Sequence, residues 1–212
     1  MRLVLLHGMG QNPSSWQDTI SNLPSDWETY TPQLFKNKGL CTYGQIYEEF
    51  VRQCEKFTEP FHLGGVSLGA ILACQYAIDY PEKVKSLLLI AVQLNPPKYL
   101  LQFQQLIFSI LPKSYFRKHG LHKEQLLLLG RSIQGLNLKK GVQQLKCPAI
   151  AICGGKDRFN QQASKDFTQI AKDAQYVVIP KAGHEVNIEQ PKALADEMVR
   201  FMSSSFEKSL QF

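Results

Sequence analysis

Short apolar runs of strand length alternate in this chain with longer segments in which apolar residues recur at helical spacing. The strand-length runs occupy residues 3–6, 62–66, 84–92, 148–153 and 175–179, and the short stretch 28–32 is a weaker candidate for a strand. The helical spacing is found near residues 14–23, 43–57, 68–80, 123–133, 163–174 and 190–202. Strands that alternate with helices form parallel sheets covered by those helices. The sequence therefore predicts an α/β fold around a mostly parallel sheet with flanking helices.

One segment interrupts this alternation. After Pro96 and Pro97 the pattern changes to long helices, and the alternation resumes only at Pro148. We predict that residues 95–141 form a small helical cap, inserted into a single core domain of residues 1–94 and 142–212. An insertion between two strands lies near the carboxyl edge of the sheet, where open α/β sheets bind ligands.

The basic residues of the chain are concentrated in the same segment. Between residues 95 and 146 there are nine Lys and Arg residues and one acidic residue, Glu124, which gives this segment +8, whereas the whole chain carries +6. This asymmetry favours either a cap that attracts an anionic substrate or leaving group, or a lysine-rich solvated helix surface.

Composition constrains the setting of the protein. Five cysteines form an odd set without metal-binding or CxxC spacing, which indicates free thiols in a reducing compartment. The apolar run at the N-terminus is too short for a signal peptide, and no run approaches the roughly 20 residues that span a bilayer. We expect a cytoplasmic protein with no metal, no cofactor, no transmembrane segment and no nucleic-acid partner.

The motif Gly65-Val66-Ser67-Leu68-Gly69 lies between a predicted strand and a predicted helix. A serine there must sit on a sharp turn to expose its hydroxyl, and the residues two positions away must be small. This pattern and context are typical of a nucleophile elbow, with Ser67 as the nucleophile. A serine hydroxyl needs a base to take its proton and a third group to orient that base.

Two residues beyond later strands fit those roles. Asp157 follows the strand at 148–153, and His184 follows the strand at 175–179. Both therefore emerge at the same edge of the sheet as Ser67, in the chain order Ser, Asp, His. We predict a catalytic triad of Ser67, Asp157 and His184.

With these residues in view, the chain resembles the α/β-hydrolase family. The matching pieces lie along nearly the whole chain outside the cap: His7-Gly8-Met9-Gly10 with Trp16 following, the Ser67 elbow, Pro81-Glu82-Lys83-Val84, Asp157, and Gly183-His184 with Glu189-Gln190-Pro191. The family sheet has eight strands, and this chain begins at what resembles the third, so the resemblance implies a core of about six strands. Gln161 departs from the family, whose acid loop often has a proline there.

The resemblance also implies the chemistry. It implies a serine hydrolase of carboxylesterase type that cleaves a small or medium carboxylic ester or thioester through an acyl-enzyme intermediate. The backbone N–H groups of Met9 and Leu68 would form the oxyanion hole. His7 shapes the first loop or is a structural, hydrogen-bonded histidine.

Substrate binding is assigned to Trp16 and to three residues of an apolar stripe in the cap, Tyr99, Phe103 and Ile107. The same stripe equally suits the packing face of the cap itself. The partner is then a small-molecule acyl substrate.

The sequence also leaves two alternative functions open. A carbon–carbon hydrolase or a lyase on the same fold would use the triad for proton abstraction. In the lyase group of this fold the nucleophile elbow continues with Gly-Gly-Arg. This chain has Gly69-Ala70-Ile71 there, which argues against the lyase. A non-catalytic ligand-binding receptor is the other alternative, since fold does not fix function.

Overall fold

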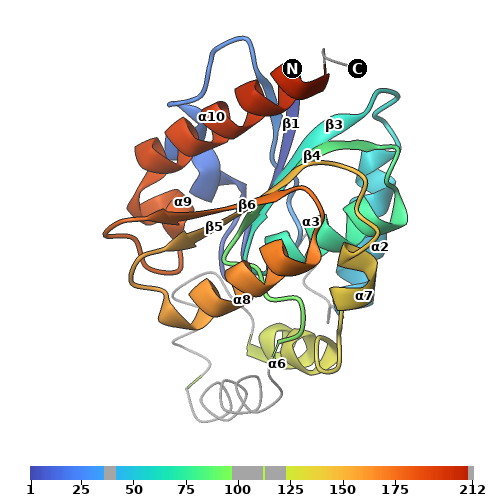
Figure 1. The fold of residues 1–212 in the computed structure, drawn as a ribbon. Helices are drawn as coiled ribbons and strands as arrows, with labels where there is room; N and C mark the ends of the chain where they lie inside the picture. The colour runs from blue at the N-terminus through green and yellow to red at the C-terminus, as the bar shows by residue number, and fades with distance from the viewer. Residues whose placement is uncertain (36–41, 97–111, 113–122, 210–212) are drawn as a thin grey trace.

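The computed structural model describes residues 1–35, 42–96, 112 and 123–209. Its centre is one sheet of six parallel strands in the order β2-β1-β3-β4-β5-β6 (Figure 1). The strands are β1 (Arg2–Leu6), β2 (Glu28–Tyr30), β3 (Phe61–Val66), β4 (Val84–Ile90), β5 (Ala149–Gly154) and β6 (Ala174–Ile179). This sheet confirms the predicted α/β fold with about six mostly parallel strands, and each strand overlaps a segment expected from the sequence.

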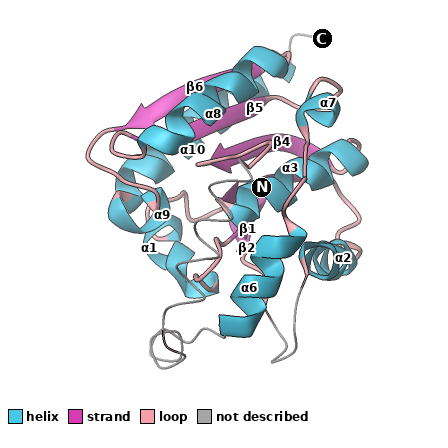
Figure 2. Ribbon diagram, turned by 90° about the horizontal axis from the view of Figure 1, so that it is seen from below, coloured by secondary structure: helices cyan, strands magenta, loops and turns pink. Residues whose placement is uncertain are grey.

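Helices cover both faces of the sheet. They are the 3₁₀ helix η1 (Pro13–Trp16), α1 (Gln17–Ile20), α2 (Tyr43–Cys54), α3 (Leu68–Asp79), α6 (Lys123–Ser132), α7 (Lys139–Val142), α8 (Arg158–Ile170), α9 (Val186–Glu189) and α10 (Pro191–Ser209). In Figure 2, α1, α9 and α10 lie together on one side, and α2, α3 and α7 lie on the other. Among the described residues, no helix is long and apolar enough to cross a membrane.

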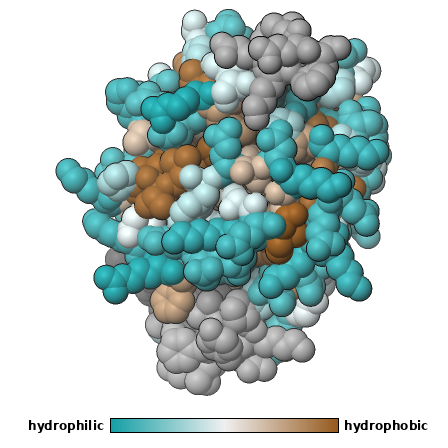
Figure 3. Space-filling view, viewed as in Figure 1, coloured by the Kyte–Doolittle hydropathy of each residue, from teal (hydrophilic) through white to brown (hydrophobic). Residues whose placement is uncertain are grey.

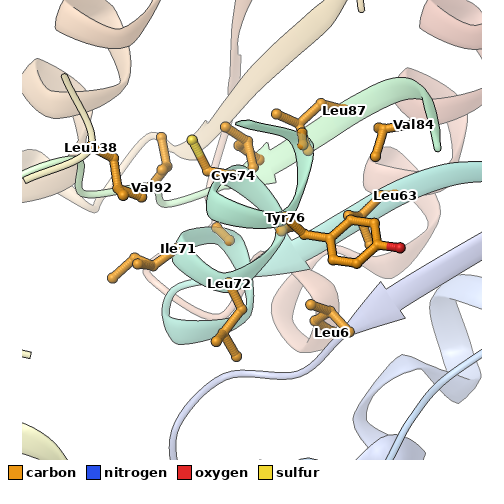
Figure 4. Packing of buried hydrophobic residues seen from close by; sticks show 14 of the residues in the cluster. Leu6, Leu63, Ile71, Leu72, Cys74, Tyr76, Val84, Leu87, Val92 and Leu138 are labelled. Carbon is orange, nitrogen blue, oxygen red and sulfur yellow. The ribbon is translucent and has the colours of Figure 1, made fainter. Parts of the chain in front are cut away.

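The strands contribute side chains to two apolar layers, one on each face of the sheet, because successive side chains point to opposite faces. In β4, Leu87 and Leu89 pack toward α2, α3 and α8, whereas Leu88 and Ile90 pack toward α10. Helix α3 is buried along most of its length, and its Ile71, Leu72 and Cys74 side chains fill the first layer (Figure 4). The face seen in Figure 3 is mainly hydrophilic, with smaller apolar patches between the polar side chains.

Helix α2 ends at Cys54, three residues before the expected end at 57, and three other helices also differ from the sequence-based expectation. The helix expected at 14–23 is a 3₁₀ turn followed by the short α1. Helix α10 continues to Ser209, beyond the expected end at 202, through a polar stretch without apolar periodicity. Helix α8 begins at Arg158 and ends at Ile170, not at 163 and 174. Its first buried position is Asn160, so apolar periodicity did not reveal the first turn.

Candidate active site

Ser67 lies on the sharp turn between β3 and α3. Its backbone has φ 55° and ψ −113°, a left-handed conformation that strains any residue except glycine. The Ser67 N–H donates to the Ile90 carbonyl of β4 at 2.9 Å, which ties the turn to the neighbouring strand. The turn thus places the serine at the carboxyl edge of the central strands.

The flanking glycines are required by close backbone approach. A Cβ atom on Gly65 would lie 2.3 Å from the Gly69 carbonyl carbon, and one on Gly69 would lie 2.2 Å from the Leu6 carbonyl oxygen. Both distances are well inside van der Waals contact, and the obstructing atoms belong to backbone. This crowding is the physical reason for small residues on both sides of Ser67.

Asp157 and His184 lie beyond the ends of β5 and β6 and face each other. The Nδ1 atom of His184 is 2.8 Å from Oδ2 of Asp157, with Asp157 buried and the His184 side chain 46% exposed. A Cβ on Gly154 would lie 2.0 Å from the Gly183 carbonyl oxygen, so the loop that carries His184 passes directly over the end of β5. Among the described residues, the Ser67 hydroxyl makes no hydrogen bond to His184, a bond that is often long in enzymes without substrate.

The Asp157 carboxyl group is set to remain ionised. Burial acts to raise its pKa, but hydrogen bonds from His184 and Asn160 outweigh burial, and the pKa lies below its ordinary value. A buried carboxylate next to Nδ1 holds the imidazole with Nε2 free to accept a proton.

Asn160 is a site residue that the sequence analysis missed. Its Nδ2 atom lies 2.9 Å and 2.7 Å from the two carboxylate oxygens of Asp157. Its Oδ1 atom accepts a hydrogen bond from Nε2 of Gln93 at 2.8 Å. The available signal was an asparagine at a position that shares the buried face of α8 with Ser164 and Phe167.

The departure at Gln161 has a local explanation. Its side-chain amide donates to the carbonyls of Gly154 at 3.2 Å and Gly155 at 3.0 Å. The amide therefore holds the turn that leads to Asp157.

The loop after β1 lies next to this site and is fixed by His7. His7 is fully buried, accepts a hydrogen bond on Nε2 from the Leu34 N–H at 3.2 Å, and donates from Nδ1 to the Gly8 carbonyl at 2.9 Å. Burial lowers its pKa, against the opposing effect of the bond to Gly8, so the ring is neutral. His7 is a hydrogen-bonded structural histidine in the loop that carries Met9.

Gln11 joins the same loop to the loop of His184. Its Oε1 accepts from the Gly8 N–H at 3.1 Å, and its Nε2 donates to Glu185 at 2.9 Å. The fully buried Asn187 adds hydrogen bonds to Gln11 Oε1 at 3.3 Å and to the Ser15 carbonyl at 3.1 Å. The two loops are therefore held to each other by side chains that lie far apart in sequence.

A model of the alpha/beta hydrolase family matches residues 3–197 of the chain. The chain belongs to the alpha/beta hydrolase family.

Relatives with different named activities cover nearly the whole chain. Monoacylglycerol lipase ABHD6 of Mus musculus is 21% identical over 95% of this chain and 75% of the lipase. A protein of Bacillus subtilis, named as a putative 2-succinyl-6-hydroxy-2,4-cyclohexadiene-1-carboxylate synthase, is 23% identical over 95% of this chain and 90% of its own length. A solved thermophilic esterase from Thermogutta terrifontis has a TM-score of 0.81 at 18% identity, covering 97% of this chain and 90% of the esterase. The likeness to the esterase shows the shared fold.

Trp16, which the sequence analysis assigned to substrate binding, is buried in this structure. Its side chain has no exposed surface and packs in the layer of Leu3, Leu5 and α10. It follows the loop after β1 in sequence, but η1 turns the indole into the core. The other three residues assigned to substrate, Tyr99, Phe103 and Ile107, lie outside the described residues.

The described part of the predicted cap packs on the hydrolase core. Leu129 and Ile133, in and just after α6, belong to the same apolar layer as α3, and the Ser132 hydroxyl accepts from the Tyr43 N–H at 2.8 Å. The Leu138 N–H donates to the Leu94 carbonyl at 2.8 Å, at the base of the insertion. Among the described residues there is no cluster of His, Cys, Asp or Glu arranged to hold a metal ion.

Proposed function

We propose that this protein is a serine hydrolase that cleaves a small or medium carboxylic ester or thioester through an acyl-enzyme intermediate. The observation that carries the proposal is the hydrogen bond from His184 to the buried Asp157, at the sheet edge where Ser67 occupies its strained turn. A strained serine turn, a histidine and a buried carboxylate together match the parts that acyl transfer requires.

In the proposed reaction, Ser67 attacks the acyl carbonyl while His184 takes the hydroxyl proton. Asp157 holds the imidazole in the correct tautomer and stabilises the imidazolium that forms. The N–H groups of Met9 and Leu68 bind the developing oxyanion; Leu68 is the first residue of α3, where backbone N–H groups are free to bind anions. His184 then protonates the leaving group, and water activated by the same histidine releases the acid.

Charge and thiol chemistry extend the proposal. The described residues 123–141 carry Lys123, Arg131, Lys139 and Lys140 against Glu124, which supports an anionic substrate or leaving group. The cysteines at 54, 74, 147 and 153 are buried and free, which supports a reducing, cytoplasmic setting.

Fluorophosphonate labelling followed by intact mass measurement tests the proposal. We expect one adduct on the wild-type protein and none on Ser67→Ala, because the reagent reacts with an activated serine. In His184→Ala the labelling rate should fall by on the order of 10³-fold or more, because the serine loses its base. An unlabelled, folded wild-type protein would contradict the proposal, as would equal labelling of Ser67→Ala.

A lyase or carbon–carbon hydrolase is the second candidate, favoured by the Bacillus subtilis relative. Such an enzyme would use His184 and Ser67 to abstract a proton without acylating the serine. A series of p-nitrophenyl esters of increasing acyl length separates the two: we expect burst kinetics of p-nitrophenol release for an acyl-enzyme mechanism. Adduct formation by the fluorophosphonate without turnover of any ester would favour the second candidate.

A further inference from the structure

A continuous series of side-chain contacts links the end of β4 to His184. Gln93, three residues beyond β4, donates through Nε2 to Oδ1 of Asn160 at 2.8 Å. Asn160 donates through Nδ2 to both oxygens of Asp157, and the same Nδ2 lies 3.1 Å from Nδ1 of His184. Oδ2 of Asp157 also accepts a hydrogen bond from Nδ1 of His184 at 2.8 Å. The contacts cross three neighbouring strand ends, those of β4, β5 and β6.

The two amides fix each other's orientation. An asparagine amide has a donor side and an acceptor side, and here Nδ2 faces an anionic carboxylate while Oδ1 faces the Gln93 amide nitrogen. Turning the Asn160 amide over would place oxygen against the carboxylate and nitrogen against nitrogen. The Asp157 carboxylate therefore requires Asn160 to present Nδ2, and Gln93 supports that orientation by donating to Oδ1.

Contact with both carboxylate oxygens also restricts rotation of Asp157. His184 Nδ1 reaches one of these oxygens, so a rotated carboxylate would lose that bond or bend it. Asn160 and Asp157 are 8% and 9% exposed, so water competes little for the same positions.

We propose that Gln93 and Asn160 form an amide relay that holds the Asp157 carboxylate in the plane required by His184. Both are positioning residues: Gln93 contacts Asn160, and Asn160 contacts Asp157 and also lies 3.1 Å from Nδ1 of His184. The relay rests on the proposed function, in which Asp157 orients the histidine that activates Ser67. The hydrogen bond that Asn160 donates also helps to keep the pKa of Asp157 low.

The first test compares Asn160→Leu and Gln93→Leu with Gln162→Leu. The control carries an amide on the same helix that donates to a carboxylate, that of Asp166 at 2.7 Å, but on the exposed surface. Labelling by a fluorophosphonate is followed over reagent concentration, which separates the inactivation rate constant from the reagent's binding constant. We expect a roughly 10–100-fold lower inactivation rate constant in Asn160→Leu, with an unchanged binding constant for the reagent. This is the range found when a group that orients a functional histidine from outside is removed.

Gln93→Leu should lower the same rate constant in the same direction by a smaller factor, and Gln162→Leu should match the wild type. Gln93 keeps the test decisive if Asn160→Leu does not fold, since Gln93 makes no hydrogen bond to Asp157 or His184 among the described residues. Wild-type rate constants in every folded relay variant would overturn the proposal.

The proton on His184 Nδ1 gives a second readout that needs no turnover. We expect this proton to give a strongly downfield resonance, which is assigned by its loss in His184→Asn. Oδ2 of Asp157 accepts from both Asn160 and His184, so removal of one donor strengthens the other bond. We expect the resonance to move further downfield in Asn160→Leu and to stay in place in Gln162→Leu.

The two readouts separate the two proposals. An unlabelled wild-type protein whose resonance still moves in Asn160→Leu would refute the hydrolase chemistry but support the relay. A labelled wild-type protein with an unmoved resonance and an unchanged rate constant would refute the relay alone.

Discussion

At the scale of single residues, the candidate site depends on backbone atoms that approach too closely for any side chain. The turn at Ser67 brings the start of α3 against the end of β1, and Gly69 lies at that contact. The strained φ of Ser67 persists because the strands on either side of β3 hold the turn from both ends.

Gly69→Ala should therefore destabilise the protein by about 3 kcal/mol or more, because the new methyl group meets the Leu6 carbonyl and has no rotamer to escape into. Urea unfolding measures the change. Gly44→Ala is the matched control: it lies in α2 with nothing within 4 Å of the new Cβ, and it should raise stability by up to about 1 kcal/mol. Equal unfolding midpoints for the two variants would contradict the structural account of the elbow.

At the scale of elements, the candidate site is formed by loops that hydrogen-bond to one another at one edge of the sheet. The loop after β1 and the loop before α9 share the hydrogen bonds of Gln11, Glu185 and Asn187. Glu189 adds a hydrogen bond from the Gly183 N–H at 2.8 Å, which fixes the turn just before His184. These contacts place the predicted oxyanion loop relative to the histidine.

Gln11→Ala should slow fluorophosphonate labelling of Ser67 by roughly 10-fold or more, because the Gly8 N–H loses its acceptor and the Met9 amide loses its position. It should also lower the free energy of unfolding by about 1–3 kcal/mol, since Asn187 keeps fewer partners while buried. Gln17→Ala, an exposed residue of α1, serves as the control. A labelling rate equal to that of the control would show that Gln11 does not position the loop.

At the scale of the whole molecule, different ionisable side chains lie at the two ends of the strands. The carboxyl ends carry the candidate site. Away from it, near the start of β3, His62 forms a 2.8 Å hydrogen bond with the buried Ser86 of β4. Burial and the nearby charges of Lys85 and the N-terminus lower the pKa of His62 to about 4.

This depressed pKa predicts how the stability of the molecule depends on pH. The unfolded chain binds a proton at His62 near pH 6.5, whereas the folded protein does so only near pH 4. The contribution of neutral His62 is therefore present above about pH 6.5 and is lost as the pH falls toward 4.

His62→Asn keeps a partner for Ser86 without a titrating group. Between pH 7 and pH 4 its free energy of unfolding should fall by about 2–3 kcal/mol less than that of the wild type. Urea unfolding at several pH values measures both slopes, and His7, which also has a lowered pKa, is retained in both proteins. Parallel slopes would refute the prediction.

Much of the fold and of the candidate site could be predicted from the sequence, because the patterns that indicate them are local. Most strands were predicted by apolar runs of four to nine residues. The glycines around Ser67 indicated a sharp turn, because the crowding there involves only a few backbone atoms. The strand that precedes each of Ser67, Asp157 and His184 set the edge at which it emerges, since parallel strands share one carboxyl edge.

The tertiary structure decided which side chains meet. Gln11 and Glu185 are 174 positions apart, and Gln93 and Asn160 are 67 apart, so no local pattern could pair them. Trp16 shows the converse: its neighbours in sequence placed it near the site, but the direction of η1 turned its ring into the core. The sequence by itself determined the order of strands and helices and the residues at the strand ends. The packing of loops across the sheet determined their partners, because hydrogen bonds and burial depend on distance in space.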